Sequence, residues 1–173
     1  TEYYVLIDAT AFDDSSSNSY AGISSTTALS FTTADVSNPT LSSSTPANNA
    51  TDVAVDSNIV LNFSESVDVE TGNITIKKKS DDSTFETIDV TGAKVSGSGS
   101  SQITINPAND FVKGVEYYVL IAATAFDDSS SNSYAGISST TALSFTVDSI
   151  ADPTKDKDVV GSIDSQSQIA KNL

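Results

Sequence analysis

Hydrophobic and polar residues alternate along most of this chain, with the period of two that is typical of β-strands. The clearest case is Ile59, Leu61 and Phe63, which alternate with Val60 and Asn62. Further strands are indicated at residues 39–46, 74–77, 84–90, 103–105 and 117–124, with polar, glycine-containing turns between them. This spacing predicts an all-β sandwich of about seven short antiparallel strands in roughly 110 residues.

One segment of the chain is repeated almost without change. Residues 2–32, here called the N-terminal copy, recur as residues 116–146, the C-terminal copy, with Asp8 replaced by Ala122. The linker sequence after each copy recurs at the same offset of 114 positions. A fixed period of this length predicts a tandem array of one structural module.

The repeat divides the chain into three expected parts. Residues 1–36 carry the last two strands of a preceding repeat and a linker, and residues 37–147 form a complete repeat. Residues 148–173 form a second linker and a candidate short helix, because apolar residues recur there at helical spacing. Asp156 and Asp158 would lie in the first turn of that helix, where its dipole favours negative charge.

The N-terminal copy by itself predicts only a β-hairpin. An isolated hairpin is marginally stable in water, because its apolar face, here Tyr3, Val5 and Ile7, has no cover. We therefore expect the body of the complete repeat, or another chain, to cover it. Strand exchange is one route to a homo-oligomer, since residues 2–32 could replace their own twin in a neighbouring molecule.

Composition removes several function classes. The chain has 8 Lys and no Arg against 23 acidic residues, a net charge of −15, which repels nucleic acid and anionic lipid. No run of apolar residues is long enough for a membrane span, so no direct membrane insertion is expected. The absence of Cys and His excludes thiol and imidazole catalysis, disulfides and thiolate or imidazole zinc sites. We do not expect an enzyme.

A loop with two carboxylates and an amide is the first candidate metal site. The oxygens of Asp127, Asp128 and Asn132 are the ligands that calcium prefers, and the twin loop repeats them as Asp13, Asp14 and Asn18. The alternative is that these side chains cap the turn by bonding to their own backbone, as Asp and Asn do in many loops.

A second acidic group is a further candidate for calcium. It consists of Glu65, Asp68, Glu70 and Asn73, and we expect it at the other side of the module. Paired carboxylates also occur in glycoside hydrolases, but this chain has no Trp to hold a sugar, which disfavours that interpretation.

Tyr117 is predicted to have a structural role. Tyr117, Val119 and Ile121 share one face of a strand, while Tyr118 falls on the other. Gly114 precedes Tyr117 by three residues, the spacing of a tyrosine corner, in which a buried tyrosine hydroxyl bonds to nearby backbone.

Several motifs resemble the bacterial Ig-like domains found in tandem in large surface proteins. The motifs begin at Ser44 (STPANNATDVAV), Ile59 (IVLNFSESVD), Gly114 (GVEYYVLI) and Leu143 (LSFT). The resemblance covers residues 38–147 and again the N-terminal copy. It implies an Ig-like sandwich outside the cell or at the bacterial cell surface. The family usually carries Gly before the Asn of the acidic loop, where this chain has Ser131.

The resemblance also implies a function. In that family the module is a spacer or adhesive unit, so we expect a non-catalytic stalk module of a large adhesin whose partners are neighbouring repeats. The alternatives are a ligand-binding or glycan-binding module and a subunit of a strand-exchanged filament. Residues 152–161 are similar to the segment that joins an autotransporter passenger to its outer-membrane barrel, which implies that this repeat is the last of a passenger.

Overall fold

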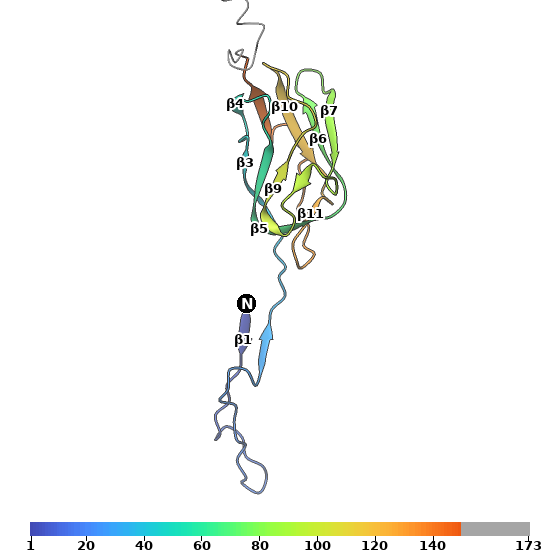
Figure 1. Ribbon diagram of the computed structural model, residues 1–173. Helices are drawn as coiled ribbons and strands as arrows, with labels where there is room; N and C mark the ends of the chain where they lie inside the picture. The colour runs from blue at the N-terminus through green and yellow to red at the C-terminus, as the bar shows by residue number, and fades with distance from the viewer. Residues whose placement is uncertain (150–173) are drawn as a thin grey trace, which may run out of the picture. The chain divides into compact units, whose positions relative to one another are not determined.

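The computed structural model describes residues 1–149, and the expected helix, with Asp156 and Asp158 in its first turn, lies outside the described residues. The described chain divides into two compact units, Thr1–Ser37 and the part that starts at Asn38 (Figure 1). Among residues 1–149 there is no helix long and apolar enough to cross a membrane.

The first unit is a long β-hairpin, as its sequence predicts. Strands β1 (Glu2–Tyr4) and β2 (Ser30–Thr32) pair antiparallel, with Tyr3 opposite Phe31. Beyond them the two arms meet again at the isolated bridges Ile7↔Ile23 and Asp13↔Ser19. All the large apolar side chains of β1 and β2 are exposed.

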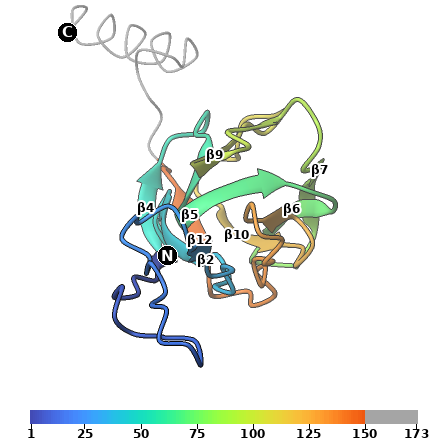
Figure 2. The same cartoon turned by 90° about the horizontal axis from the view of Figure 1, so that it is seen from below.

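The second unit is a β-sandwich, which confirms the all-β prediction. One sheet has the order β4-β12-β10-β6-β7 and the other the order β11-β5-β9-β8, with β3 pairing β5 (Figures 1 and 2). The strand bounds are β3 Leu41–Thr45, β4 Ala50–Val53, β5 Ile59–Val69, β6 Asn73–Lys78, β7 Thr84–Asp89, β8 Val95–Ser96, β9 Ser100–Ile105, β10 Glu116–Ile121, β11 Phe126–Asp127 and β12 Ser144–Val147.

The core follows the predicted alternation. Inward-facing residues of β5, β6, β9 and β10 are buried, whereas the polar residues between them are more exposed. Fully burying one such side chain stabilises the fold by about 1.5 to 3 kcal/mol. The least exposed members are Ile59, Leu61, Ile74, Ile76, Ile103, Ile105, Tyr117 and Val119.

Aromatic residues fill one end of this core and include the predicted tyrosine corner. The backbone N–H of Val112 donates a hydrogen bond to the hydroxyl of Tyr117 at 3.0 Å. The Tyr117 ring lies 5.0 Å from that of Phe111 and 5.1 Å from that of Phe85, measured between centroids. Phe145 of β12 completes the cluster. Tyr117 therefore links β7 and β12 of its own sheet to the loop that precedes β10.

The sandwich differs from the predicted one in two details. More and shorter strands form than the seven expected, and the β4–β12 pair is parallel, with Val53 opposite Val147. The entering strand causes the parallel pair and one of the additional strands, and the two-residue strands β8 and β11 add to the number as well. It pairs with β5 as β3 and then, after Pro46, continues as β4 in the opposite sheet.

Candidate functional site

The loop from Phe126 to Tyr134 carries the first predicted site. A short strand, β11, leads into it, and the bridge Asp127↔Ser133 closes it. The carboxylate of Asp128 lies inside the loop and is 6% exposed. Its Oδ1 accepts the backbone N–H groups of Ser130 and Asn132, both at 2.8 Å, and its Oδ2 accepts the side-chain amide of Asn132, also at 2.8 Å.

These hydrogen bonds stabilise the charged form of Asp128. The side-chain amide of Asn132, followed by the backbone N–H groups of Asn132 and Ser130, holds the pKa of the Asp128 carboxyl below its usual value despite its burial. Asp14 has the same three partners in the N-terminal copy, and its pKa is lowered in the same way. Asp128 thus serves its own loop, which is the capping role weighed against calcium above.

The backbone conformation of this loop explains why the bacterial Ig-like domains that the chain resembles usually have glycine at the position of Ser131. Ser131 has a φ of +64°, and its twin Ser17 has a φ of +65°. In this left-handed region a Cβ atom crowds the following carbonyl, so glycine is the residue that fits without strain. The chain keeps the geometry of the loop with serine in that place.

The second acidic group lies beside the first, so its predicted place on the other side of the module was wrong. Strand β11 pairs with the end of β5, which sets Asp68 opposite Asp127. A carboxylate oxygen of Glu65 lies within 4.8 Å of one of Asp128. The backbone N–H of Glu70 donates to the carbonyl of Ala125. The error arose because the sequence does not show which strand pairs with the short β11.

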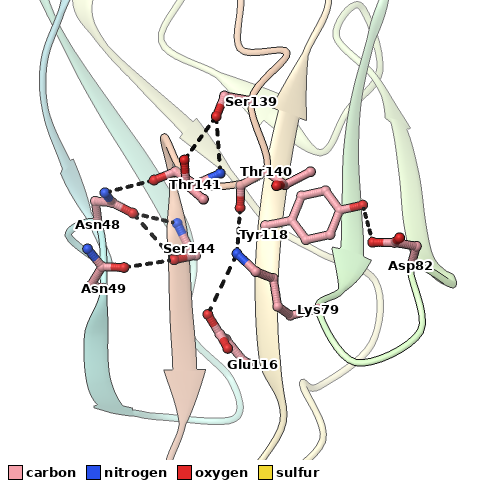
Figure 3. Close-up of polar contacts among 10 residues, drawn as sticks. All are labelled: Asn48, Asn49, Lys79, Asp82, Glu116, Tyr118, Ser139, Thr140, Thr141 and Ser144. Carbon is pink, nitrogen blue, oxygen red and sulfur yellow. Dashed lines mark hydrogen bonds and ion pairs between the residues drawn. The ribbon is translucent and has the colours of Figure 1, made fainter.

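A polar cluster on the outer face of the other sheet was missed by the sequence analysis. The Nζ of Lys79 donates to the carbonyl of Thr140 at 2.8 Å and lies 4.0 Å from the Glu116 carboxylate and 5.8 Å from the centre of the Tyr118 ring (Figure 3). The Tyr118 hydroxyl donates to Asp82 at 3.0 Å. Burial, together with this bond, raises the pKa of Tyr118.

This cover explains why Tyr118 is only 2% exposed although it lies on the outward face of β10. The aliphatic part of a lysine can cover apolar surface while its charge stays near water. The strand alternation alone assigned Tyr118 to the surface. The available signal was the lysine run at residues 77–79, which ends β6 beside β10.

The same cluster extends to the start of β4. The side-chain amide of Asn48 donates to the carbonyl of Thr141 at 3.0 Å, and its oxygen accepts the backbone N–H of Ser144 at 2.9 Å (Figure 3). Asn49 accepts a bond from the Ser144 hydroxyl at 3.2 Å. Together with Lys79, these asparagines hold the loop before β12 from both sides, and we call the whole set the polar clasp. It consists of Asn48, Asn49, Lys79, Asp82, Glu116, Tyr118, Ser139, Thr140, Thr141 and Ser144.

The fold and these contacts define a β-sandwich repeat module whose notable polar groups fasten its own loops and strands. The chain belongs to the bacterial Ig-like domain family, because the model of the bacterial Ig-like domain matches residues 35–147. This match confirms the Ig-like resemblance seen in the motifs. The domains of this family are generally non-catalytic structural modules.

No curated protein matches the chain. Among solved structures, the chain is similar to the S-layer protein rSbsC(31-844), with a TM-score of 0.44 and 17% sequence identity. The similarity covers 66% of this chain and 14% of that one, so this chain spans a small part of the length of the S-layer protein.

Proposed function

We propose that the chain is a non-catalytic tandem-repeat module of a large bacterial cell-surface or secreted adhesin, and that it acts as a stalk. A stalk module must add length, so its chain must enter at one end and leave at the other. The period of 114 residues in the sequence supplies the tandem arrangement.

The path of the chain through the second unit carries this proposal. Strand β3 starts at one end of the sandwich, and β12 leaves it at the opposite end (Figure 1). Strands β3 and β4 run in succession along one edge, and the end of β4 lies beside the end of β12, with Val53 opposite Val147. The roughly 13 residue-to-residue steps from Thr40 to Val53 span at most about 43 Å when extended, which bounds the length of the sandwich between its entry and its exit.

Charge fits an extracellular stalk as well. A net charge of −15 keeps neighbouring modules soluble and makes like-charged molecules repel one another. The proposal includes the remaining expectations: a location outside the cell, neighbouring repeats as partners, and residues 152–161 as a junction to an outer-membrane barrel.

Arrays of two, four and six copies of the 114-residue period test the stalk. Small-angle X-ray scattering should give a maximum dimension that grows in proportion to the number of modules. Growth with the cube root of the number, as in a compact particle, would contradict the proposal. A glycan-array signal from a single module would favour the ligand-binding alternative instead.

A further inference from the structure

The N-terminal and C-terminal copies are nearly identical in sequence but differ in burial: apolar side chains that are exposed in the first are buried in the second. Phe12 is 61% exposed and Phe31 is 54% exposed, whereas their twins Phe126 and Phe145 are fully buried or nearly so. Tyr3 is 49% exposed, and its twin Tyr117 is fully buried. The N-terminal copy therefore carries the apolar surface of a closed sandwich without the cover.

The structure also shows what covers this surface in the C-terminal copy. The cover is residues 38–115, here called the opening half, which supply β3 to β9. Strand β10 pairs with β6, and β12 pairs with β4. In the N-terminal copy, β1 pairs only with β2, so the edge that β6 occupies in the twin is open.

The N-terminal copy has a hollow at the place where, in the C-terminal copy, an aromatic ring of the opening half packs. It measures about 530 Å³ and is lined by Ile7, Phe12, Asp13, Asp14, Asn18, Ser19 and Tyr20. In the C-terminal copy the ring of Phe63 packs against the twins of two of these residues, 5.4 Å from Phe126 and 5.1 Å from Tyr134 between centroids. A phenylalanine equivalent to Phe63 is therefore the side chain that this hollow fits.

On the outer face, the residues of the polar clasp also indicate that an opening half would fit the N-terminal copy. Six of the ten residues of the polar clasp (Figure 3) belong to the C-terminal copy. In the sequence, each of these six has an identical twin in the N-terminal copy. The other four, Asn48, Asn49, Lys79 and Asp82, belong to the opening half. The six twins are Glu2, Tyr4, Ser25, Thr26, Thr27 and Ser30.

We infer that the N-terminal copy is a docking surface for an opening half equivalent to residues 38–115, carried on the N-terminal side of Glu2 in the same polypeptide. The complete repeat has the same order, because residues 38–115 precede residues 116–146 there. The inference deepens the proposed tandem-repeat function and rests on it.

An intact second molecule does not serve as this partner. Each molecule has one opening half and two copies of the segment that closes it. If residues 2–32 of one molecule entered another, they would displace residues 116–146 there and expose the same apolar surface. Exchange therefore gains no burial while it costs the entropy of association.

The single difference between the copies, Asp8 in place of Ala122, should affect how tightly an opening half docks. A Cβ atom placed on Gly72 would lie 2.9 Å from the Cβ of Ala122, so little room remains between these positions. Asp8 stands in the place of Ala122 and is larger. An opening half with the sequence of residues 38–115 should therefore dock more tightly on the D8A variant than on the native segment.

The test is a full-length chain extended by residues 38–115 fused directly ahead of Glu2. We expect a second folded module, so the calorimetric enthalpy of unfolding should about double, since that enthalpy scales with the number of folded residues. A cysteine at Val5 reports burial in a chain that has no native Cys. Its reaction with a thiol reagent should slow by on the order of 100-fold, because a buried thiol reacts only when its surroundings open.

Register is tested by disulfide formation. Leu120 lies opposite Thr75 in the β10–β6 pair. Cysteines at Leu6 of the native segment and at the Thr75 equivalent of the extension should therefore cross-link within one molecule. A cysteine at Thr32 in place of Leu6 is the matched control, because its twin Thr146 lies opposite Glu116 on β12 and away from β6.

Three results would overturn the inference. One is an unchanged reaction rate at Val5→Cys in the extended chain, and another is equal protection by a scrambled extension of the same composition. The third is a disulfide-linked dimer of the unextended chain carrying Leu6→Cys and Thr75→Cys, which would show exchange between two molecules. Failure here leaves the stalk proposal standing, because scattering from arrays of the complete 114-residue period does not depend on the N-terminal copy.

Discussion

The hydroxyl of Tyr117 accepts a hydrogen bond from the backbone N–H of Val112, 3.0 Å away, across the turn that contains Gly114. Because the ring is fully buried, Tyr117→Phe should keep the packing and lose only this bond. We expect the free energy of unfolding to fall by about 1 kcal/mol, measured by urea denaturation. Tyr3→Phe is the matched control at the exposed twin and should change it by less than about 0.5 kcal/mol. Equal effects at the two positions would contradict the structural role of Tyr117.

Ser131 offers a stabilising substitution. Its φ of +64° is unfavourable for serine, so Ser131→Gly should raise the free energy of unfolding by about 0.5 to 1 kcal/mol. Ser17→Gly makes the same change at the same φ in the N-terminal copy and should leave the melting of the sandwich unchanged. A lower melting temperature for Ser131→Gly would show that the serine side chain has a role that the backbone does not explain.

The sequence predicted the core of the sandwich well because each long strand alternates regularly. Ile59 to Phe63 and Tyr117 to Ile121 show their buried faces by period alone. The tyrosine corner was also predictable, since it depends on a local spacing from Gly114. Nothing local marks the switch from β3 to β4 between the two sheets, and that switch produced the parallel pair with β12.

The candidate site was harder to predict than the core. The capping role of Asp128 follows from its own loop, so the sequence could offer it as an alternative. The approach of Glu65 and Asp68 to that loop depends on the pairing of β11 with β5, which joins residues about 60 positions apart. The polar clasp depends likewise on contacts between distant segments, such as Lys79 with Thr140. The alternation of apolar and polar side chains does not show which distant segments come into contact, so it could predict neither the acidic group nor the polar clasp.

The loop carboxylate predicts a specific response to acid. Hydrogen bonds from Asn132 lower the pKa of Asp128 in the folded protein, so Asp128 contributes stability above its ordinary pKa of about 3.8. This contribution is lost as the pH falls through the lowered pKa of the folded state. The difference in melting temperature between wild type and Asp128→Asn should therefore be largest above pH 5 and shrink below about pH 3.8.

The twin loop supplies the control for this experiment. Asp14→Asn removes the equivalent charge from the N-terminal copy, where the pKa of Asp14 is also lowered. Its effect on the melting of the sandwich should be negligible at every pH, because Asp14 lies in the other compact unit. A difference between wild type and Asp128→Asn that stays constant from pH 7 to pH 3 would mean that the charge of Asp128 does not stabilise the fold.

Calcium binding at Asp127, Asp128 and Asn132 stays a prediction, and the structure sharpens its test. Three hydrogen bonds occupy three of the roughly four acceptor positions of the Asp128 carboxylate, so a cation must draw further oxygens from nearby acids. Within the sandwich, Asp68 opposite Asp127 and Glu65 beside Asp128 are candidates. Extracellular calcium modules bind with dissociation constants of roughly 10⁻⁴ to 10⁻³ M.

At 10 mM calcium, such an affinity adds about 1.4 to 2.7 kcal/mol to the free energy of unfolding, by mass action. The melting temperature should therefore rise on adding calcium to chelated protein, and Asp127→Asn or Glu65→Gln should reduce the rise. Magnesium is the control, because it favours a smaller and stricter octahedral site. If the melting curve in 10 mM calcium coincides with the curve in chelator, the acidic residues of this loop act only on their own backbone. In that case any stiffness of the proposed stalk has to come from contacts other than calcium, such as the polar clasp.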